Sequence, residues 1–168
     1  STTLGTAIDT FVRDLVKAFN TNTLDSLDLN NYKNINESLP MLKNNILNIL
    51  LQLKSQGYTV TSESIIAEGA IQAIDSDSNM HEIPIAGTID LLAYNENGDY
   101  ILIDIKSRHD AKYNKESWNT YSKQLSLYKA LLENKYGIKI KDIAVLPIGV
   151  SYKTPSLDKP KSLNTVLY

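Results

Sequence analysis

The stretch from Gly87 to Lys106, GTIDLLAYNENGDYILIDIK, constrains the fold of this chain more than any other feature of its sequence. Apolar residues recur at every second position on both sides of Asn97-Gly98, a period typical of half-buried β-strands. Asn-Gly is also a strong hairpin signal, because glycine accepts the positive φ that tight hairpin loops require. The pattern therefore predicts a strand over residues 83–94 and a second over residues 101–106, joined through the loop Glu96-Asn97-Gly98.

Each predicted strand carries one aspartate. If Asn95 pairs with Asp99, Asp90 falls opposite Asp104, where directly opposed β-carbons lie roughly 4.5–5.5 Å apart. A two-residue loop would shift the register by one residue and make this contact diagonal. Lys106 follows Asp104 at the same strand face. Because like charges that face each other are destabilising without a cation between them, this pattern indicates a site for a divalent metal and a phosphate.

The alternative is that both aspartates point into water from an open antiparallel sheet. A solvated face would usually carry several polar residues, whereas Leu92, Tyr94 and Leu102 share the predicted face with the two aspartates. We therefore favour the metal-site interpretation.

Composition narrows the kind of metal and the kind of protein. A chain of 168 residues, 42% hydrophobic and 21% charged, is typical of one globular domain. It has no cysteine, which excludes a disulfide, a thiolate zinc site and an iron-sulfur cluster, and its two histidines are too few for a histidine-based site. Any metal should be a hard cation with oxygen ligands. Without a membrane-length apolar run or a signal-peptide pattern, we expect no membrane partner and a cytoplasmic location, in a bacterial or phage-infected cell.

Charge is distributed unevenly although the net charge is only −2. Residues 1–105 hold 5 Lys/Arg and 14 Asp/Glu, while residues 106–168 hold 12 and 5. This division suits a carboxylate site beside a surface that attracts phosphate, which is compatible with nucleic acid. It is equally compatible with basic residues that simply form the solvated face of one helix and a tail.

The first helix is predicted over residues 4–20, from apolar residues at helical spacing such as Ile8, Phe11 and Leu15. Asp9 lies just off this stripe, followed by Arg13 and Lys17, and on its own this spacing favours a surface ion-pair ladder. Because the helix begins almost at the first residue, we expect the chain to be a piece of a longer protein.

The remaining elements follow in order. A loop over residues 20–37 precedes a second helix, which Ser38 caps and Gly57 ends. Residues 58–70 form a predicted strand with Glu63 as a candidate acid, and IDSDSNMHE is a turn. A third helix over residues 117–136 places Gln124 inside its core stripe, pointing the same way as Tyr128. Residues 140–152 are a strand in which Pro147 indicates an edge or a bulge, followed by a tail.

This order of elements and motifs resembles the PD-(D/E)XK nucleases, most closely their RecB-like branch. The motifs are Gly87 with Asp90, Asp104-Ile105-Lys106, and Gln124 with Tyr128. The resemblance spans nearly the whole chain and implies an α/β, restriction-endonuclease-like core, with a mixed central β-sheet flanked by helices in the order αβββαβ. It also implies metal-dependent hydrolysis of DNA phosphodiesters. In the family the first helix carries a G-T-x-x-H pattern, and here Asp9 replaces its metal-binding histidine.

The resemblance assigns roles to particular residues. Mg²⁺ or Mn²⁺ would be held by Asp90, Asp104, Asp9 and the backbone carbonyl of Ile105, with Glu63 as a weaker ligand. Lys106 would orient the attacking water or stabilise transition-state charge. Nucleic acid would be contacted by Gln124, Tyr128, Arg108, Lys112, Lys115 and Lys123.

Three functions remain open at this point. The first is an active nuclease, an exonuclease rather than a site-specific endonuclease, acting on DNA. The second is a weak or inactive nuclease-like module that binds DNA or a partner protein within a larger repair, recombination or phage complex. The third is a carboxylate-rich metal-binding domain unrelated to nucleic acid.

Overall fold

The structure is a computed structural model, and it describes residues 2–32, 39–63, 65–108, 115–152 and 160–165. Its helices are α1 (Thr2–Thr21), α2 (Leu39–Ser55) and α3 (Lys115–Tyr136), with short 3-10 turns η1 (Leu24–Ser26) and η2 (Leu29–Asn31). Its strands are β1 (Thr59–Thr61), β2 (Ile65–Ile74), β3 (Met80–Ile89), β4 (Leu91–Tyr94), β5 (Asp99–Arg108), β6 (Lys139–Tyr152) and β7 (Pro160–Thr165).

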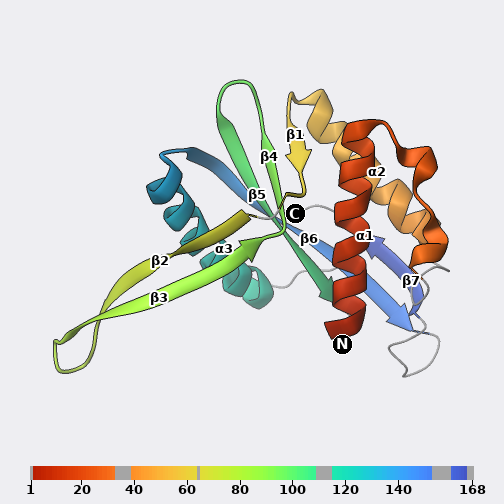
Figure 1. Cartoon of the computed structure of the whole chain (residues 1–168). Coiled ribbons are helices and arrows are strands. Elements are labelled where there is room, and N and C mark those ends of the chain that lie inside the picture. The colour runs from red at the N-terminus through yellow and green to blue at the C-terminus, as the bar shows by residue number, and fades with distance from the viewer. Residues whose placement is uncertain (1, 33–38, 64, 109–114, 153–159, 166–168) are drawn as a thin grey trace.

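The main sheet has five strands in the order β1-β4-β5-β6-β7. Strand β5 runs parallel to β6, while the other neighbouring pairs are antiparallel. Helices α1 and α2 lie on one side of this sheet and α3 lies on the other (Figure 1). The predicted fold class, a mixed sheet flanked by helices, is confirmed. No helix in the described ranges combines the length and the apolar character needed to cross a membrane.

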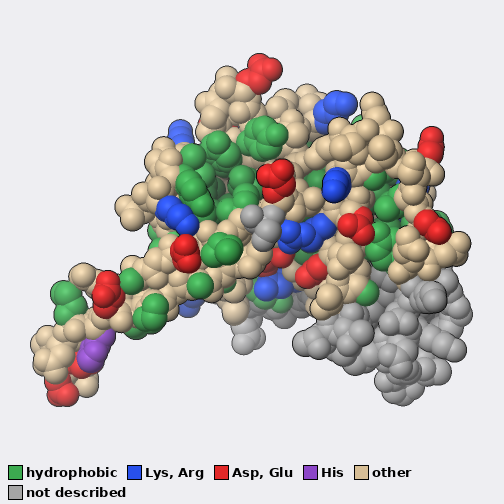
Figure 2. All heavy atoms as spheres, viewed as in Figure 1, with side chains coloured by type: hydrophobic (Ala, Val, Ile, Leu, Met, Phe, Trp, Pro, Cys, Tyr) green, Lys and Arg blue, Asp and Glu red, His purple; other side chains and the backbone are tan. Residues whose placement is uncertain are grey.

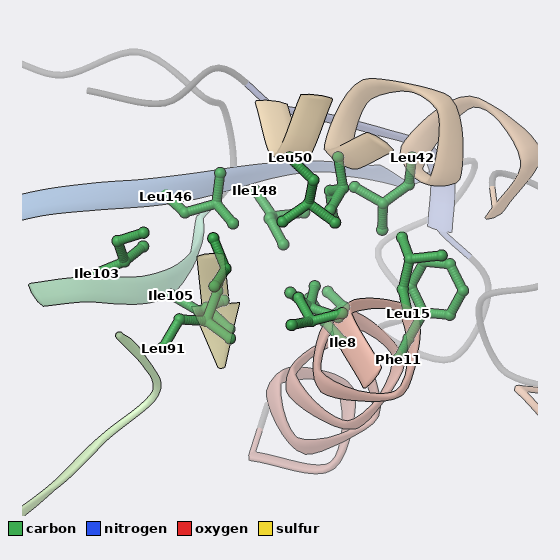
Figure 3. Close-up of a cluster of buried hydrophobic side chains, with 14 of the residues drawn as sticks. Ile8, Phe11, Leu15, Leu42, Leu50, Leu91, Ile103, Ile105, Leu146 and Ile148 are labelled. Carbon is green, nitrogen blue, oxygen red and sulfur yellow. The ribbon is translucent and has the colours of Figure 1, made fainter. Parts of the chain in front are cut away.

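The larger part of the core fills the space between the sheet and the first two helices. Residues of α1 such as Ile8, Phe11 and Leu15 face residues of α2 such as Leu42 and Leu50 across the inward side chains of β4, β5 and β6 (Figure 3). The helical spacing predicted from the sequence is therefore the packing face of α1.

The opposite face of the sheet is buried as well. Leu92 and Leu102 pack with Leu132 of α3 in a second core cluster. Because both faces of β5 are covered, Asp104, which shares a strand face with Leu102 and Lys106, points toward the α3 side and not into open water.

The predicted hairpin register is confirmed, but its first strand is divided in two. Leu91 pairs with Ile103 and Tyr94 with Tyr100, the Asn95 amide donates to the Asp99 carbonyl, and Gly98 has φ +79°. Strand β3, however, ends at Ile89 and pairs with β2 in a separate two-stranded sheet. The chain therefore bends at Asp90, between the two sheets.

Other boundaries depart from the prediction in informative ways. Ser38 lies outside the described residues. Residues 58–70 contain β1 and the first part of β2 instead of a single strand. The predicted tail includes β7, which pairs with the end of β6, so Pro147 does not mark an edge strand. On its described side, Pro147 pairs in register with Lys106 of β5, and the described pairing shows no register shift at this position.

Candidate active site

Asp104 is the most buried of the predicted site carboxylates. The residue is 9% exposed on β5, where the alternation of the strand turns its side chain toward α3. Its Oδ2 atom lies 3.1 Å from Nζ of Lys106. This approach lacks the alignment of a hydrogen bond, and within the described part of the chain Oδ2 has no hydrogen-bond partner. A buried carboxylate oxygen needs a compensating cation, and the Lys106 ammonium supplies part of that compensation.

Asp90 is held against the same strand by a backbone contact. Its Oδ2 atom accepts a hydrogen bond of 2.8 Å from the amide of Ile105. If the β4–β5 ladder continued in register past Leu91, Ile105 would face Ile89, but the bend at Asp90 takes β3 away from β5. The side chain of Asp90 therefore supplies the acceptor at the point where the ladder ends.

The two carboxylates influence each other strongly. Burial and hydrogen bonding with Asp90 raise the pKa of Asp104 to about 7, although the positive charge of Lys106 opposes the rise. At neutral pH and without a cation, the pair therefore retains part of a proton. Asp90 and Asp104 are not a paired position of the ladder, which ends at Leu91 and Ile103, but the register of the hairpin brings the two carboxylates near each other.

Asp9 reaches the same site from α1. Burial, together with the negative charge of Asp90, raises the pKa of Asp9 to about 6, although the positive charges of Arg13 and Lys106 oppose the rise. The predicted surface ladder is wrong, because Arg13 donates a 2.8 Å hydrogen bond to the Ser62 carbonyl, and the described residues form no Asp9–Arg13 ion pair. The family resemblance marked Asp9 as a replacement for a histidine, but nothing in the sequence predicted the hydrogen bond from Arg13 to Ser62.

Lys106 is half-buried beside these acids. Burial alone would lower its pKa, but the charge of Asp104 raises it above its usual value. Its Nζ also lies 5.2 Å from the centroid of the Tyr121 ring on α3, a cation–π contact that restricts the ammonium. The sequence placed Tyr121 only in the core stripe, because nothing in the spacing of α3 reports which strand residue lies above a given ring.

These residues fit a hard divalent cation. Oδ2 of Asp104 is buried without a hydrogen bond, and the pKa values of Asp104 and Asp9 are both raised. Each observation indicates that the nearby positive charges do not fully balance the negative charge of the carboxylates. A cation would relieve each of them, and carboxylate oxygens are the ligands that Mg²⁺ and Mn²⁺ prefer. In the described ranges no three acidic or histidine side chains already stand close enough together to hold a metal. Binding would therefore draw the carboxylates closer.

The structure separates Glu63 from this cluster. Glu63 is exposed after β1 and lines a different cavity together with Lys17, Asn20 and Thr21. None of the charges that shift the pKa values of Asp9 and Asp104 belongs to Glu63. For Ile105 the structure gives the amide contact to Asp90, and its carbonyl stays a predicted ligand.

On the α3 side, the prediction for Gln124 was partly wrong. Gln124 is exposed and not buried in the core stripe, because Leu125 and Leu132 face the sheet in its place. Its Nε2 does lie 3.2 Å from Oη of Tyr128, so the two side chains point together as predicted. Lys123 is also exposed on α3. The side chains of Arg108 and Lys115, and the whole of Lys112, lie outside what the structure describes.

A contact that the sequence analysis missed joins Gly87 to Tyr128. A Cβ atom on Gly87 would overlap Oη and Cζ of the Tyr128 phenol, so the absence of a side chain on β3 makes room for the ring. The only sequence signal was the presence of both residues in motifs, which gives no reason to pair them. Because Gly87 precedes Asp90 by three residues, this contact fixes β3 against α3 just before the bend.

In the view of Figure 2, basic and acidic side chains are gathered near the middle of the face, over β5 and α1. The arrangement presents a carboxylate pair, a third carboxylate from a separate helix and an ammonium within one site. Such a site can bind a divalent cation and hold a phosphate group beside it.

Comparison with known proteins agrees with this geometry. No curated protein matches the chain. The family model described as the PD-(D/E)XK nuclease superfamily matches residues 13–166, which include Asp90, Asp104 and Lys106 and begin after Asp9. Nucleases of this superfamily generally use divalent metal ions. The match covers most of the chain, and the chain therefore belongs to the PD-(D/E)XK nuclease superfamily.

Proposed function

We propose that this protein is a Mg²⁺- or Mn²⁺-dependent deoxyribonuclease of the RecB-like branch that removes nucleotides from DNA ends. The observation that carries the proposal is the coupling of Asp90, Asp104 and Lys106 at the point where β3 leaves the main sheet. The RecB-like assignment rests on the three motifs of the sequence, including Gln124 with Tyr128 on α3, whose side chains point together.

Asp90 and Asp104 are the proposed principal metal ligands, and Asp9 is the proposed third. When bound, the cation would polarise the scissile phosphate and lower the pKa of the attacking water. Asp104 supplies a buried oxygen paired with the Lys106 ammonium, and Asp90 is oriented by the Ile105 amide. Because Asp9 comes from α1, its contribution depends on how that helix packs on the sheet.

Lys106 acts in this scheme as a cation and not as a general base. Its raised pKa keeps the side chain protonated at neutral pH, and the Tyr121 ring limits its positions. A fixed ammonium can donate to a phosphate oxygen or orient a water molecule, and it stabilises the negative charge that develops in the transition state. Removing such a group typically lowers the rate about 10²–10³-fold.

The proposed DNA strand passes over α3 beside the carboxylates. The exposed Gln124 and Lys123 and the partly buried Tyr128 lie on this helix, which also carries Tyr121 beneath Lys106. Amide, phenol and ammonium groups bind phosphate and sugar oxygens without selecting a base sequence. This surface suits an enzyme that processes ends more than one that recognises a specific site.

A cleavage assay tests the proposal directly. Linear single-stranded and double-stranded DNA should shorten from their ends in Mg²⁺ or Mn²⁺, closed circular DNA should resist, and EDTA should abolish the reaction. Asp104→Ala should lose at least about 10²-fold of the rate, whereas Asp25→Ala, at an exposed position on η1, should cleave like the parent. Cleavage by Asp104→Ala at the parent rate would rule out the proposed mechanism.

The separation of the three carboxylates favours a second function, a nuclease-like module that does not cleave. In the described ranges Asp9, Asp90 and Asp104 do not form a ready three-ligand cage, and the family match does not include Asp9. Both observations are compatible with a nuclease-like module that binds DNA or a partner protein without cleaving. DNA binding with no cleavage in Mg²⁺ or in Mn²⁺ would establish this function in place of the first.

A further inference from the structure

Strands β2 and β3 form an arm that leaves the body of the molecule (Figure 1). They pair continuously from Ile65 with Ile89 at the base to Ile74 with Met80 at the tip. The base is anchored, because Ala67 is fully buried and Gly69 lies against Leu131 of α3. A two-stranded ribbon is marginally stable in water on its own, so the outer part of this arm lacks the support that larger sheets provide.

The outer part of the arm is apolar and exposed. Ile74 is 66% exposed and Met80 is 61% exposed, and Ile66 and Ile83 of the same two strands are exposed as well. Within the described residues, four of the nine exposed large hydrophobic side chains belong to this one hairpin. Figure 2 shows hydrophobic side chains along the arm and acidic ones near its end. Such a concentration marks a surface that binds another macromolecule.

The tip is ordered before any partner binds. Oδ1 of Asp75 accepts hydrogen bonds from the amides of Asp77, at 2.9 Å, and Asn79, at 3.0 Å. Oδ2 of Asp75 lies 2.6 Å from Nε2 of His81 on the opposite strand. These bonds fix the turn, so Ile74 and Met80 are presented as a preformed pair and little conformational entropy is lost on docking.

The charge of the arm argues against nucleic acid as its partner. Residues 65–89 contain Glu68, Asp75, Asp77 and Glu82 and no lysine or arginine. A phosphate backbone is bound by basic side chains, and this segment would repel it. A partner that complements the arm would have an apolar cavity with positively charged residues beside it.

The same chain carries a hollow of this kind. An open cavity of about 440 Å³ is lined by Ile65, Leu92, Tyr100, Leu132, Tyr136 and Ile138. It lies between α3, the base of the arm and the main sheet, and neither Asp90 nor Asp104 lines it. Lys139 and Lys141, both exposed at the start of β6, follow its lining residue Ile138 in the chain. A water molecule takes up about 30 Å³ in the liquid, so the cavity is many times larger than one water molecule. It therefore has room for more than one aliphatic side chain.

We propose that the arm docks into this cavity on a second copy of the chain. Ile74 and Met80 of each copy enter the cavity of the other, and the acidic tip lies beside Lys139 and Lys141. The exchange is reciprocal. In a dimer with a two-fold axis the same contact occurs twice, so both arms are docked. The proposal is independent of the nuclease chemistry, because none of these residues belongs to the carboxylate site.

Because the chain contains no cysteine, engineered cysteines test the contact cleanly. Protein with Met80→Cys and protein with Tyr136→Cys, mixed in equal amounts under mild oxidation, should give a disulfide-linked heterodimer. The matched control mixes Met80→Cys with Met41→Cys, since Met41 is similarly exposed, at 57%, but lies on α2. A heterodimer yield no higher than in the control would overturn the proposal.

Sedimentation then tests whether the arm drives assembly. The parent should be a dimer, Met80→Asp should weaken the dimer at least about tenfold, and Met41→Asp should leave it unchanged. A monomeric parent, or equal effects of the two substitutions, would contradict the proposed exchange. If the parent is monomeric and Met80→Asp also lowers its DNA affinity, the arm binds nucleic acid instead of a second copy. Circular dichroism should show that both variants fold, because both substitutions are at exposed positions.

Discussion

Asp90 accepts a hydrogen bond of 2.8 Å from the amide of Ile105, the residue that separates Asp104 from Lys106. This contact joins the bend between the two sheets to the strand that carries the other site residues. It positions one carboxylate by backbone geometry alone, whereas Asp104 is positioned by burial and by the alternation of β5. The two acids therefore meet for different physical reasons.

Replacing Asp104 by asparagine should stabilise the protein in the absence of metal. The pKa of Asp104 is raised to about 7, so the folded state binds more protons than the unfolded state between about pH 4 and 7. Stability contributed by this group is then highest at low pH and is lost as the pH rises through about 7. Asp104→Asn should raise the unfolding free energy above pH 7 by roughly 2–4 kcal/mol, and by little near pH 4. Urea unfolding across this pH range, with Asp25→Asn as control, measures the difference.

Two substitutions of Asp90 should separate its structural role from its chemical role. Asparagine retains an oxygen that can accept from the Ile105 amide, whereas alanine leaves that amide without its acceptor. Both variants should lose cleavage, but Asp90→Ala should also lose about 1–3 kcal/mol of stability relative to Asp90→Asn. Equal unfolding free energies for the two variants would show that the hydrogen bond does not hold the bend.

Removing the charge of Lys106 should affect catalysis more than metal binding. Lys106→Gln leaves both aspartates in place but removes the ammonium 3.1 Å from Asp104. The cleavage rate should fall about 10²–10³-fold. Binding of Mn²⁺, measured by calorimetry, should be retained or strengthened, because a competing cation has gone. Weaker binding together with unchanged cleavage would assign Lys106 to the metal site and not to the transition state.

The contact between Gly87 and Tyr128 should behave as a coupled pair. Gly87→Ala places a methyl group in the space of the phenol and should destabilise the protein by about 1–3 kcal/mol. In the background of Tyr128→Leu, which removes the overlapping atoms, the same change should cost much less. Additive unfolding energies in this double-mutant cycle would show that β3 and α3 do not depend on each other here.

The hairpin was predictable because its turn chemistry and its alternation agree. Asn97-Gly98 sets the loop, and the register of β4 with β5 follows from it. The bend at Asp90 was not predictable, because the apolar alternation continues from β3 into β4 while the pairing partner changes from β2 to β5. Local sequence reports which residues face inward, but not which strand they face.

The candidate site divides in the same way. Asp90, Asp104 and Lys106 were found from one hairpin, since their separation is set by local geometry. The environment of Asp9 and the contacts of Tyr121 and Tyr128 depend on how α1 and α3 lie across the sheet. Gln124 was misplaced because helical spacing leaves the edge of a core stripe uncertain by one residue. Strand β7 was missed because Pro160 and Lys161 are residue types that are uncommon in strands. The segment forms a strand through its pairing with β6, which the local sequence does not report.

The most direct test of the central claim is anomalous diffraction from crystals soaked in Mn²⁺. We predict one strong peak between Asp90 and Asp104, about 2.0–2.2 Å from an oxygen of each carboxylate, with Asp9 directly or through water as the third ligand. The same peak should be absent from crystals of Asp104→Asn. A peak that contacts neither aspartate, or no peak at saturating Mn²⁺, would contradict the claim that these acids share one cation.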